Sequence, residues 1–210
     1  MSASAFLSFT SVLKSSAEKL SSNRYILGFL AIARAIDSNI RFGAENADDE
    51  TIRLAAEISK SSEFIDSKPQ KYNEPVSQGG TNVSGGQKQL LNLASIMVMQ
   101  PKVLILDEPT SQLDPIAASE FLKVIYRINR ELGTTVIISE HRLEELFTMA
   151  DRVMVMDGGR ILAMDTPWKV GDYLAGSCES QRHPMFYGLP AVMKIYYCLL
   201  YTSDAADDLI

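Results

Sequence analysis

Two acidic residues, Asp107 and Glu108, directly follow a short apolar run, Val103 to Leu106, in this chain of 210 residues. Such a run is typical of a strand buried on both faces of a sheet. Open α/β sheets bind ligands at the carboxyl ends of their strands. Two carboxylates there are costly to desolvate unless they meet a cation or a polarised water. The position suits Mg²⁺ and an attacking water at a γ-phosphate, or simply the start of a solvated turn.

A second polar feature is the stretch Ser84-Gly85-Gly86-Gln87, which opens a helical pattern. Backbone N–H groups and the dipole at a helix start favour an anion, and glycines permit its close approach. The simpler interpretation is a Ser N-cap with a glycine-rich entry.

Two further residues follow or precede predicted elements in a similar way. His141 comes after a β-rich run, Thr134 to Ser139, and a histidine there can donate to a phosphate oxygen. A lone histidine is equally compatible with a structural role. Asp114 precedes a helical segment, where it is compatible with a simple helix cap.

The order of the elements predicts an α/β fold with a largely parallel sheet, because strands and helices alternate. We expect helices at residues 48–64, 86–99, 116–132 and 143–149, with Gly133 as a C-cap. We expect strands at residues 103–106 and 134–139, and a hairpin over 153–164. Residues 101–165 should then form a parallel-sheet core in which Asp107, Glu108 and His141 converge at the carboxyl edge.

Composition excludes several other classes of protein. Hydrophobic residues make up 46% of the chain and charged residues 22%, which is ordinary for a globular protein. The net charge of −6 gives no reason to expect nucleic acid as a partner. Cys178 and Cys198 provide no disulfide or metal framework. Apolar stretches such as Tyr25 to Ala33 are too short to span a bilayer, so we expect a cytosolic protein.

Taken together, the polar features occur in an order and spacing that resemble the ATP-binding-cassette (ABC) ATPases. Val83 to Gln87 resembles their signature motif, and Val103 to Glu108 resembles Walker B with the catalytic Glu. Ser111 to Asp114 resembles the D-loop, and His141 resembles the switch His. The resemblance covers about residues 39–197.

The resemblance implies that two such domains pair head to tail around two ATP molecules. Asp107 would hold Mg²⁺ through water, Glu108 would activate the attacking water, and His141 would stabilise the γ-phosphate. Asp114 would couple the two sites. The signature-like residues would contact ATP bound to the partner domain; they are Ser84, Gly85, Gly86 and Gln87. A transmembrane subunit on another chain would be the further partner, which implies a peripheral protein at the cytoplasmic face of the plasma membrane.

Two subfamilies are represented in the chain. Residues 90–197, with "LLNLASIMVMQPKVLILDEPTSQLDPIAASEF", resemble the ATPases of energy-coupling-factor importers, which take up vitamins or metal ions. Residues 39–89, with "NIRFGAENADDE", resemble the nucleotide-binding domain of a multidrug or lipid exporter. The two subfamilies have the same residues at "SGGQKQ", where the two parts of this chain meet. We therefore expect a chimera, or else a natural subfamily with both features.

The phosphate cradle of this family, Gly-x-x-x-x-Gly-Lys-Ser/Thr, does not occur in the sequence. The nearest candidate, Lys14-Ser15, has no glycine nearby, and no Gln-bearing loop occurs in residues 25–38. We expect the distal part of a nucleotide-binding domain that binds ATP weakly by itself. The expected parts are a foreign or disordered 1–38, a helical signature subdomain 39–100, the second half of the catalytic core 101–175, an extension 176–197 and an artefactual tail 198–210. Residues 198–208 resemble a translated sequencing adapter.

The resemblance thus implies an incomplete ATP-binding and ATP-hydrolysing subunit of an ABC transporter, of the energy-coupling-factor importer type. The alternatives are an exporter nucleotide-binding domain and a chimeric, non-catalytic fragment that only interacts with a partner cassette. A stand-alone cassette protein of ribosomes or DNA repair would carry tandem cassettes or a coiled-coil insertion, and neither pattern occurs in the sequence.

Overall fold

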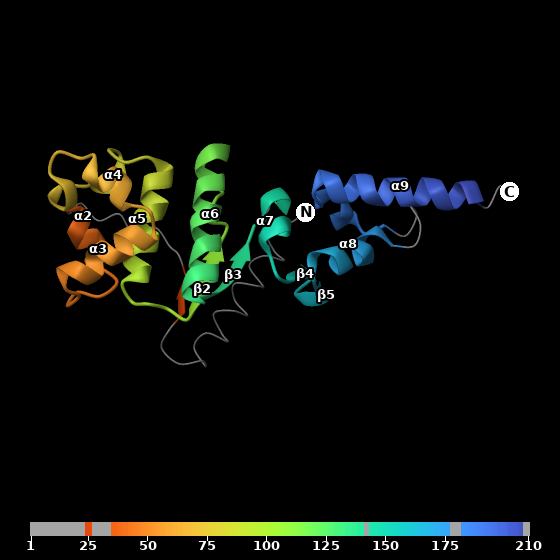
Figure 1. The fold of residues 1–210 in the computed structure, drawn as a ribbon, viewed down its shortest axis with the longest axis horizontal. Coiled ribbons are helices and arrows are strands. Elements are labelled where there is room, and N and C mark those ends of the chain that lie inside the picture. The colour runs from red at the N-terminus through yellow and green to blue at the C-terminus, as the bar shows by residue number, and fades with distance from the viewer. Residues whose placement is uncertain (1–23, 27–34, 141–142, 177–181, 208–210) are drawn as a thin grey trace. The chain divides into compact units, whose positions relative to one another are not determined.

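The computed structural model describes residues 24–26, 35–140, 143–176 and 182–207. The described residues fall into two compact units, one within residues 21–140 and the other within residues 141–210. We call the first the sheet unit and the second the C-terminal unit, and each is described by itself. Figure 1 shows their elements along the chain.

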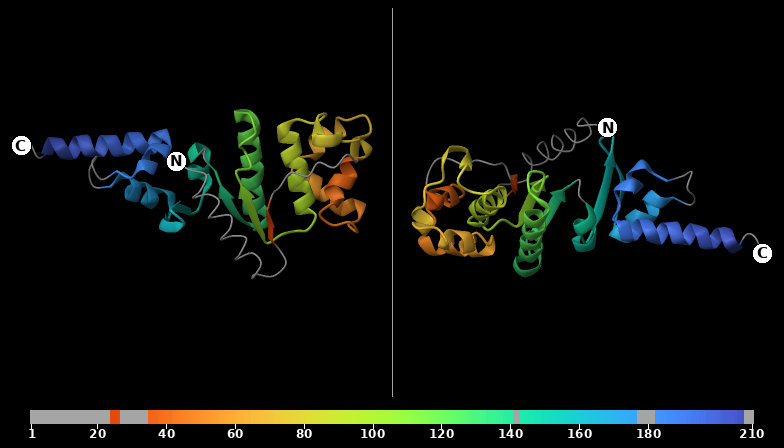
Figure 2. Two further views of the ribbon diagram at one scale, coloured as in Figure 1. Left: turned by 180° about the vertical axis from the view of Figure 1, so that it is seen from behind. Right: turned by 90° about the horizontal axis from the view of Figure 1, so that it is seen from above.

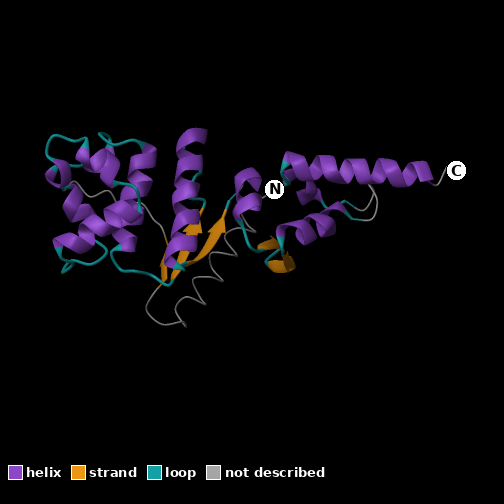
Figure 3. Cartoon of the chain, viewed as in Figure 1, coloured by secondary structure: helices purple, strands orange, loops and turns teal. Residues whose placement is uncertain are grey.

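A three-stranded parallel sheet lies at the centre of the sheet unit. Its strands are β1 (Arg24–Ile26), β2 (Val103–Asp107) and β3 (Thr135–Ser139), in the spatial order β1-β2-β3. The three apolar residues in the middle of β2 are at most 6% exposed, as expected for a strand covered on both faces. The predicted α/β fold with a parallel sheet is therefore confirmed (Figure 3). β1 lies within residues 1–38, the segment that we expected to be foreign or disordered.

Five helices accompany the sheet in the described part of this unit. They are α2 (Ile36–Arg41), α3 (Asp49–Ile58), α4 (Ser62–Asp66), α5 (Gly85–Met97) and α6 (Pro115–Leu132), with 3₁₀ turns η1 (Lys71–Asn73) and η2 (Gln78–Gly80). α5 and α6 begin within one residue of their predicted starts. α6 ends at Gly133, which has the left-handed φ of 66° that a glycine C-cap favours.

The prediction of one helix over residues 48–64 is wrong, because the chain breaks between α3 and α4. Ser59 and Ser61 are fully buried there, and both hydroxyls donate to the carbonyl of Ala56, at 3.1 and 3.3 Å. Lys60 between them has a left-handed φ of 62°. Serine side chains that bond to nearby carbonyls compete with helical hydrogen bonds, so the amphipathic pattern alone could not reveal the break.

One apolar core is shared by the helices and the sheet of this unit. Figure 2 shows the ribbon of these elements in two further views. α2, α3, α5, β2 and α6 each contribute to it, and its fully buried members include Ile40, Ile52, Leu93, Leu104 and Phe121. The signature-like helix α5 is therefore packed into the same core as the strand that carries Asp107.

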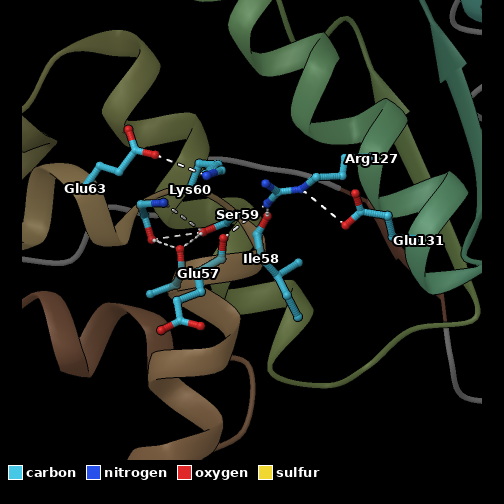
Figure 4. A network of polar contacts seen from close by, with 9 residues as sticks. Glu57, Ile58, Ser59, Lys60, Glu63, Arg127 and Glu131 are labelled. Carbon is cyan, nitrogen blue, oxygen red and sulfur yellow. Dashed lines mark hydrogen bonds and ion pairs between the residues drawn. The ribbon is translucent and has the colours of Figure 1, made fainter.

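A polar contact joins α3 to α6 at the edge of this core (Figure 4). Arg127 of α6 donates from Nη2 to the carbonyl oxygens of Ile58, at 2.7 Å, and Glu57, at 3.2 Å. A cation at a helix C-terminus also suits the helix dipole. Glu131 lies 3.8 Å from Arg127 Nε, where it helps to orient the guanidinium. The contact links residues 69 positions apart.

The C-terminal unit contains α7 (Leu143–Met149), β4 (Val153–Asp157), β5 (Arg160–Asp165), α8 (Pro167–Ala175), the 3₁₀ turn η4 (Pro184–Gly188) and α9 (Ala191–Asp207). The predicted hairpin is confirmed. However, β4 and β5 form an antiparallel sheet of their own, so the expectation of one parallel core over residues 101–165 is wrong. Gly158 and Gly159 both have positive φ and form the two-residue turn that joins β4 to β5.

A second apolar core, with Val170, Phe186, Leu189 and Tyr197, packs α8 and η4 against α9. α9 continues across position 198 to Asp207, so secondary structure does not break where the tail was expected to begin. In the described part of the chain, no helix combines the length and the apolar character needed to cross a membrane.

The first stability prediction concerns Gly43, which follows α2 and faces α5. A Cβ at this position would overlap the main-chain carbonyl oxygen of Ser95, and a main-chain atom cannot rotate away. We expect Gly43→Ala to lower the free energy of unfolding by about 1–3 kcal/mol in urea denaturation. Ser95→Gly should not restore it, because the obstacle is a backbone atom. Recovery in the double variant would contradict this packing.

The second concerns Arg127. Arg127→Met keeps the aliphatic stem but removes both hydrogen bonds from Nη2 to the end of α3, so we expect a loss of about 1–2 kcal/mol in unfolding free energy. Glu131→Gln is the matched control. Its ion pair is exposed, and the expected change is below about 0.5 kcal/mol. Equal losses in the two variants, measured by urea denaturation, would show that the ion pair rather than the carbonyl contact stabilises this edge.

Candidate functional site

The carboxyl edge of β2 and β3 brings several polar groups together. The register pairs Asp107 with Ser139, and Ser139 Oγ donates to Asp107 Oδ1 at 2.7 Å. The backbone N–H of Glu108 donates to the carbonyl of Ser139 at 3.0 Å. Both acidic side chains are half-buried. The edge therefore holds one carboxylate in a defined orientation with a second directly beside it.

Glu108 has an unusual backbone conformation for a residue other than glycine. Its φ is 44°, in the left-handed region that non-glycine residues seldom adopt. Residues held in such conformations cluster at functional sites, because the surrounding structure must sustain the strain. Here the sustaining contacts are the bond from its N–H to Ser139 and the bond from Ser111 N–H to its carbonyl, at 3.2 Å.

Glu140 is a site residue that the sequence reasoning missed. Its Oε1 accepts from the backbone N–H of Thr110 at 2.8 Å, and Thr110 is 2% exposed. Glu140 thus holds the turn that leaves β2. A signal was present: Glu140 directly follows β3 as Glu108 directly follows β2, and parallel strands end at one edge.

The Ser84–Gln87 turn forms a reciprocal cap at the start of α5. Ser84 Oγ accepts from the N–H of Gln87 at 3.2 Å, and the N–H of Ser84 donates to Gln87 Oε1 at 3.1 Å. This is a capping box, so the N-cap interpretation is confirmed. Ser84 and Gly85 are exposed. The exposed first turn of a helix can also attract an anion, so the two interpretations are compatible.

Asp114 is the N-cap of α6. Its Oδ1 accepts from the N–H groups of Ile116 and Ala117, each at 3.0 Å, and Pro115 occupies the first helical position, as is common. The simple interpretation of Asp114 as a helix cap is confirmed. The predicted role in coupling two sites stays a prediction.

The Ser84–Gln87 turn lies against the segment that contains Asp114. A Cβ on Gly85 would be 3.4 Å from Leu113 Cδ2, and one on Gly86 would be 3.2 Å from the Cβ of Ala117. The sheet edge leads into this same segment through the turn after Glu108. The structure therefore connects three of the expected motifs within the sheet unit: the signature-like turn, the Walker-B-like strand and the D-loop-like segment. His141 lies outside the described residues, and its approach to Glu108 stays a prediction.

The residues at the sheet edge fit Mg²⁺ in their chemistry. Within the described ranges, no group of three or more His, Cys, Asp or Glu side chains could hold a metal ion. Mg²⁺ usually takes one or two carboxylates, several waters and substrate phosphates rather than an all-protein cage. Asp107, Glu108 and Ser139 offer oxygen atoms only, which suits such a partial set of ligands.

The sheet unit is thus an α/β domain with carboxylates at the carboxyl edge of parallel strands and a capped, exposed helix start nearby, and its fold matches that of an ABC ATPase domain. Residues 12–111 match the family model described as ABC transporter. A solved structure, of a bacterial Atm1-family ABC exporter with ATP bound, aligns with a TM-score of 0.61 at 27% identity. The alignment covers 70% of this chain and 26% of that one.

Curated relatives are ATP-binding proteins of ABC transporters. The chain is 55% identical over 125 residues to a "Putative ABC transporter ATP-binding protein" of Bacillus anthracis, covering 60% of this chain and 22% of that protein. It is 36% identical over 139 residues to an energy-coupling factor transporter ATP-binding protein of Symbiobacterium thermophilum, covering 66% of this chain and 46% of that protein. The chain therefore has homologues among ABC transporter ATP-binding proteins, and it spans less than half the length of either relative.

The capping role of Asp114 gives a third prediction. Asp114→Ala removes the acceptor for two N–H groups and should lower the unfolding free energy by about 1 kcal/mol. Asp114→Ser keeps a capping oxygen without the carboxylate, so its stability should stay within a few tenths of a kcal/mol of the parent. Urea denaturation followed by circular dichroism tests both. If the serine variant loses as much as the alanine variant, the carboxylate charge rather than the cap stabilises α6.

Proposed function

We propose that this chain is an incomplete ATP-binding and ATP-hydrolysing subunit of an ABC transporter, of the energy-coupling-factor importer type. The observation that carries the proposal is the edge of β2 and β3, where Ser139 orients Asp107 and the strained Glu108 lies beside it. The relative from Symbiobacterium thermophilum supports the importer type.

At this edge, Asp107 would hold Mg²⁺ through water, with its Oδ1 kept in place by the Ser139 hydroxyl. Bound Mg²⁺ would neutralise charge on the phosphates. Glu108 would take a proton from the attacking water, and general-base catalysis of this kind is worth about 10²–10⁴ in rate. His141 would donate to the γ-phosphate. Glu140 would keep the turn after β2 in place through Thr110.

The Ser84–Gln87 turn would serve ATP bound to a second nucleotide-binding domain, and Asp114 would couple the two sites. The exposed start of α5, with its capping box, supports this assignment because it presents backbone N–H groups in a defined geometry. Closure of the two domains around ATP would move a transmembrane subunit at the cytoplasmic face of the plasma membrane, since a ligand that binds one state more tightly shifts the population toward it.

A second candidate function is that of an exporter nucleotide-binding domain. The alignment with the Atm1-family exporter favours it, since 70% of this chain is covered. Both candidates use the same chemistry at the sheet edge and differ in the partner domain and the membrane subunit.

The fourth prediction tests the proposed function in trans. We would mix the chain with a cassette whose phosphate-binding loop is intact but whose own signature Ser is replaced by Arg. The Ser84–Gln87 turn should complete the partner's site and raise its phosphate release by about tenfold, equivalent to about 1.4 kcal/mol of barrier. Ser84→Arg should abolish this stimulation, because bulk and charge would occupy the position of the phosphate.

The matched control is Ser67→Arg, which makes the same change at another exposed serine of the sheet unit and should leave the stimulation intact. Two partners separate the candidates: stimulation of an importer cassette alone favours the importer type, and stimulation of an exporter cassette alone favours the exporter. Absence of stimulation with both partners, in a folded chain, would overturn the proposed function.

A further inference from the structure

The first turns of α5 and α6 come close together at Gly86 and Ala117. A Cβ on Gly86 would lie 3.2 Å from the Cβ of Ala117, which is closer than the usual carbon–carbon separation of about 3.5–4.0 Å. The Ala117 methyl group is attached directly to the helix backbone and cannot rotate away. The two helices can therefore approach this closely because residue 86 has no side chain.

The neighbouring glycine meets a different environment. A Cβ on Gly85 would be 3.4 Å from Leu113 Cδ2, at the far end of a flexible side chain, and 3.5 Å from the carbonyl oxygen of Gln112. Both separations are ordinary van der Waals contacts. Packing within this chain therefore disfavours a side chain at position 86 more than at position 85.

Each of the two turns also carries its own cap, and the Gly86 contact joins the caps. Gln87, next to Gly86, donates its N–H to Ser84 Oγ. Ala117 donates its N–H to Asp114 Oδ1. Ala117 is thus a capped residue of α6 whose methyl group lies directly beside Gly86.

We propose that Ala117 is a positioning residue: it seats Gly86 and makes the Ser84–Gln87 turn and the Asp114 cap one mechanical unit. The functional meaning of this contact rests on the proposed function, in which the Ser84–Gln87 turn contacts the partner's ATP and Asp114 couples the two ATP sites. A movement of the Ser84–Gln87 turn at the partner's phosphates would then displace Asp114 through the main chain and the contact with the Ala117 methyl group. No chain of hydrogen bonds between side chains would be needed.

Thermal unfolding of the full chain tests the contact. Alanine favours a helix over glycine, so Gly85→Ala should keep or raise the midpoint, whereas Gly86→Ala should lower it by about 2–4 °C. Ala117→Gly alone should lower the midpoint, because glycine weakens the helix. On the Gly86→Ala background it should raise the midpoint instead, since the obstructing methyl is gone. Additive effects in this double-mutant cycle would overturn the contact.

Amide exchange measured by NMR tests the coupling between the two helix starts. A clash that stayed local to one helix start would not change the exchange rates of amides in the other. Gly86→Ala should speed exchange of the Ile116 and Ala117 amides by about threefold or more, and Gly85→Ala should not. In the reverse direction, Ala117→Val should speed exchange of the Gln87 amide, because coupling between two sites is reciprocal. The reverse variant keeps the proposal testable if Gly86→Ala fails to fold.

Unchanged exchange at Ile116 in Gly86→Ala, together with unchanged exchange at Gln87 in Ala117→Val, would overturn the coupling. None of these measurements uses nucleotide or a partner. A failure here is therefore distinguishable from a failure of the proposed function, which the trans assay reports.

Discussion

The parallel pairing of β2 with β3 is the constraint on which the rest of the sheet unit depends. Because a parallel register places the last residues of both strands at one edge, Asp107 faces Ser139 and Glu108 bonds to the same residue. The apolar residues of β2 constrain that register from inside the core, since a slip by one residue would bring Lys102 or Asp107 into a buried position. The geometry of the polar edge is thus set by apolar burial.

The same dependence extends to the helix starts. α5 is packed into the core that contains β2, and α6 begins a few residues after the turn at Glu108. Ser84 and Asp114 each satisfy backbone N–H groups that a helix leaves open at its first turn. These residues stabilise their helices whether or not nucleotide is present. A structural cap and a functional role are therefore not competing explanations, and variants such as Asp114→Ser separate them.

The comparisons describe a shared ATP-binding domain more clearly than a direction of transport. One relative carries an energy-coupling factor description and the solved structure is an exporter. The groups at the sheet edge are the kind that phosphoryl transfer requires, and they do not distinguish import from export.

The amino-acid sequence by itself determined the features that depend on neighbours along the chain. The apolar run at Val103, the Gly133 cap and the Gly-Gly hairpin could be located because burial on both faces, a left-handed φ and a tight turn each demand particular residue types nearby. The motif order also indicated the fold and the family of relatives. Asp114 was recognised as a possible cap for the same local reason.

Only the tertiary structure decided features that join residues distant in the chain. Three such features leave no periodic pattern in the sequence. They are the pairing of β1 with β2, the hydrogen bond between Glu140 and Thr110 across 30 positions, and the hydrogen bond from Arg127 to the end of α3. The close approach of Gly86 to Ala117 is also a tertiary feature. From the sequence alone, Gly86 is interpreted only as a ligand-binding or helix-entry residue. Such contacts depend on how helices and strands pack in space, and packing is set by the whole core rather than by any single segment.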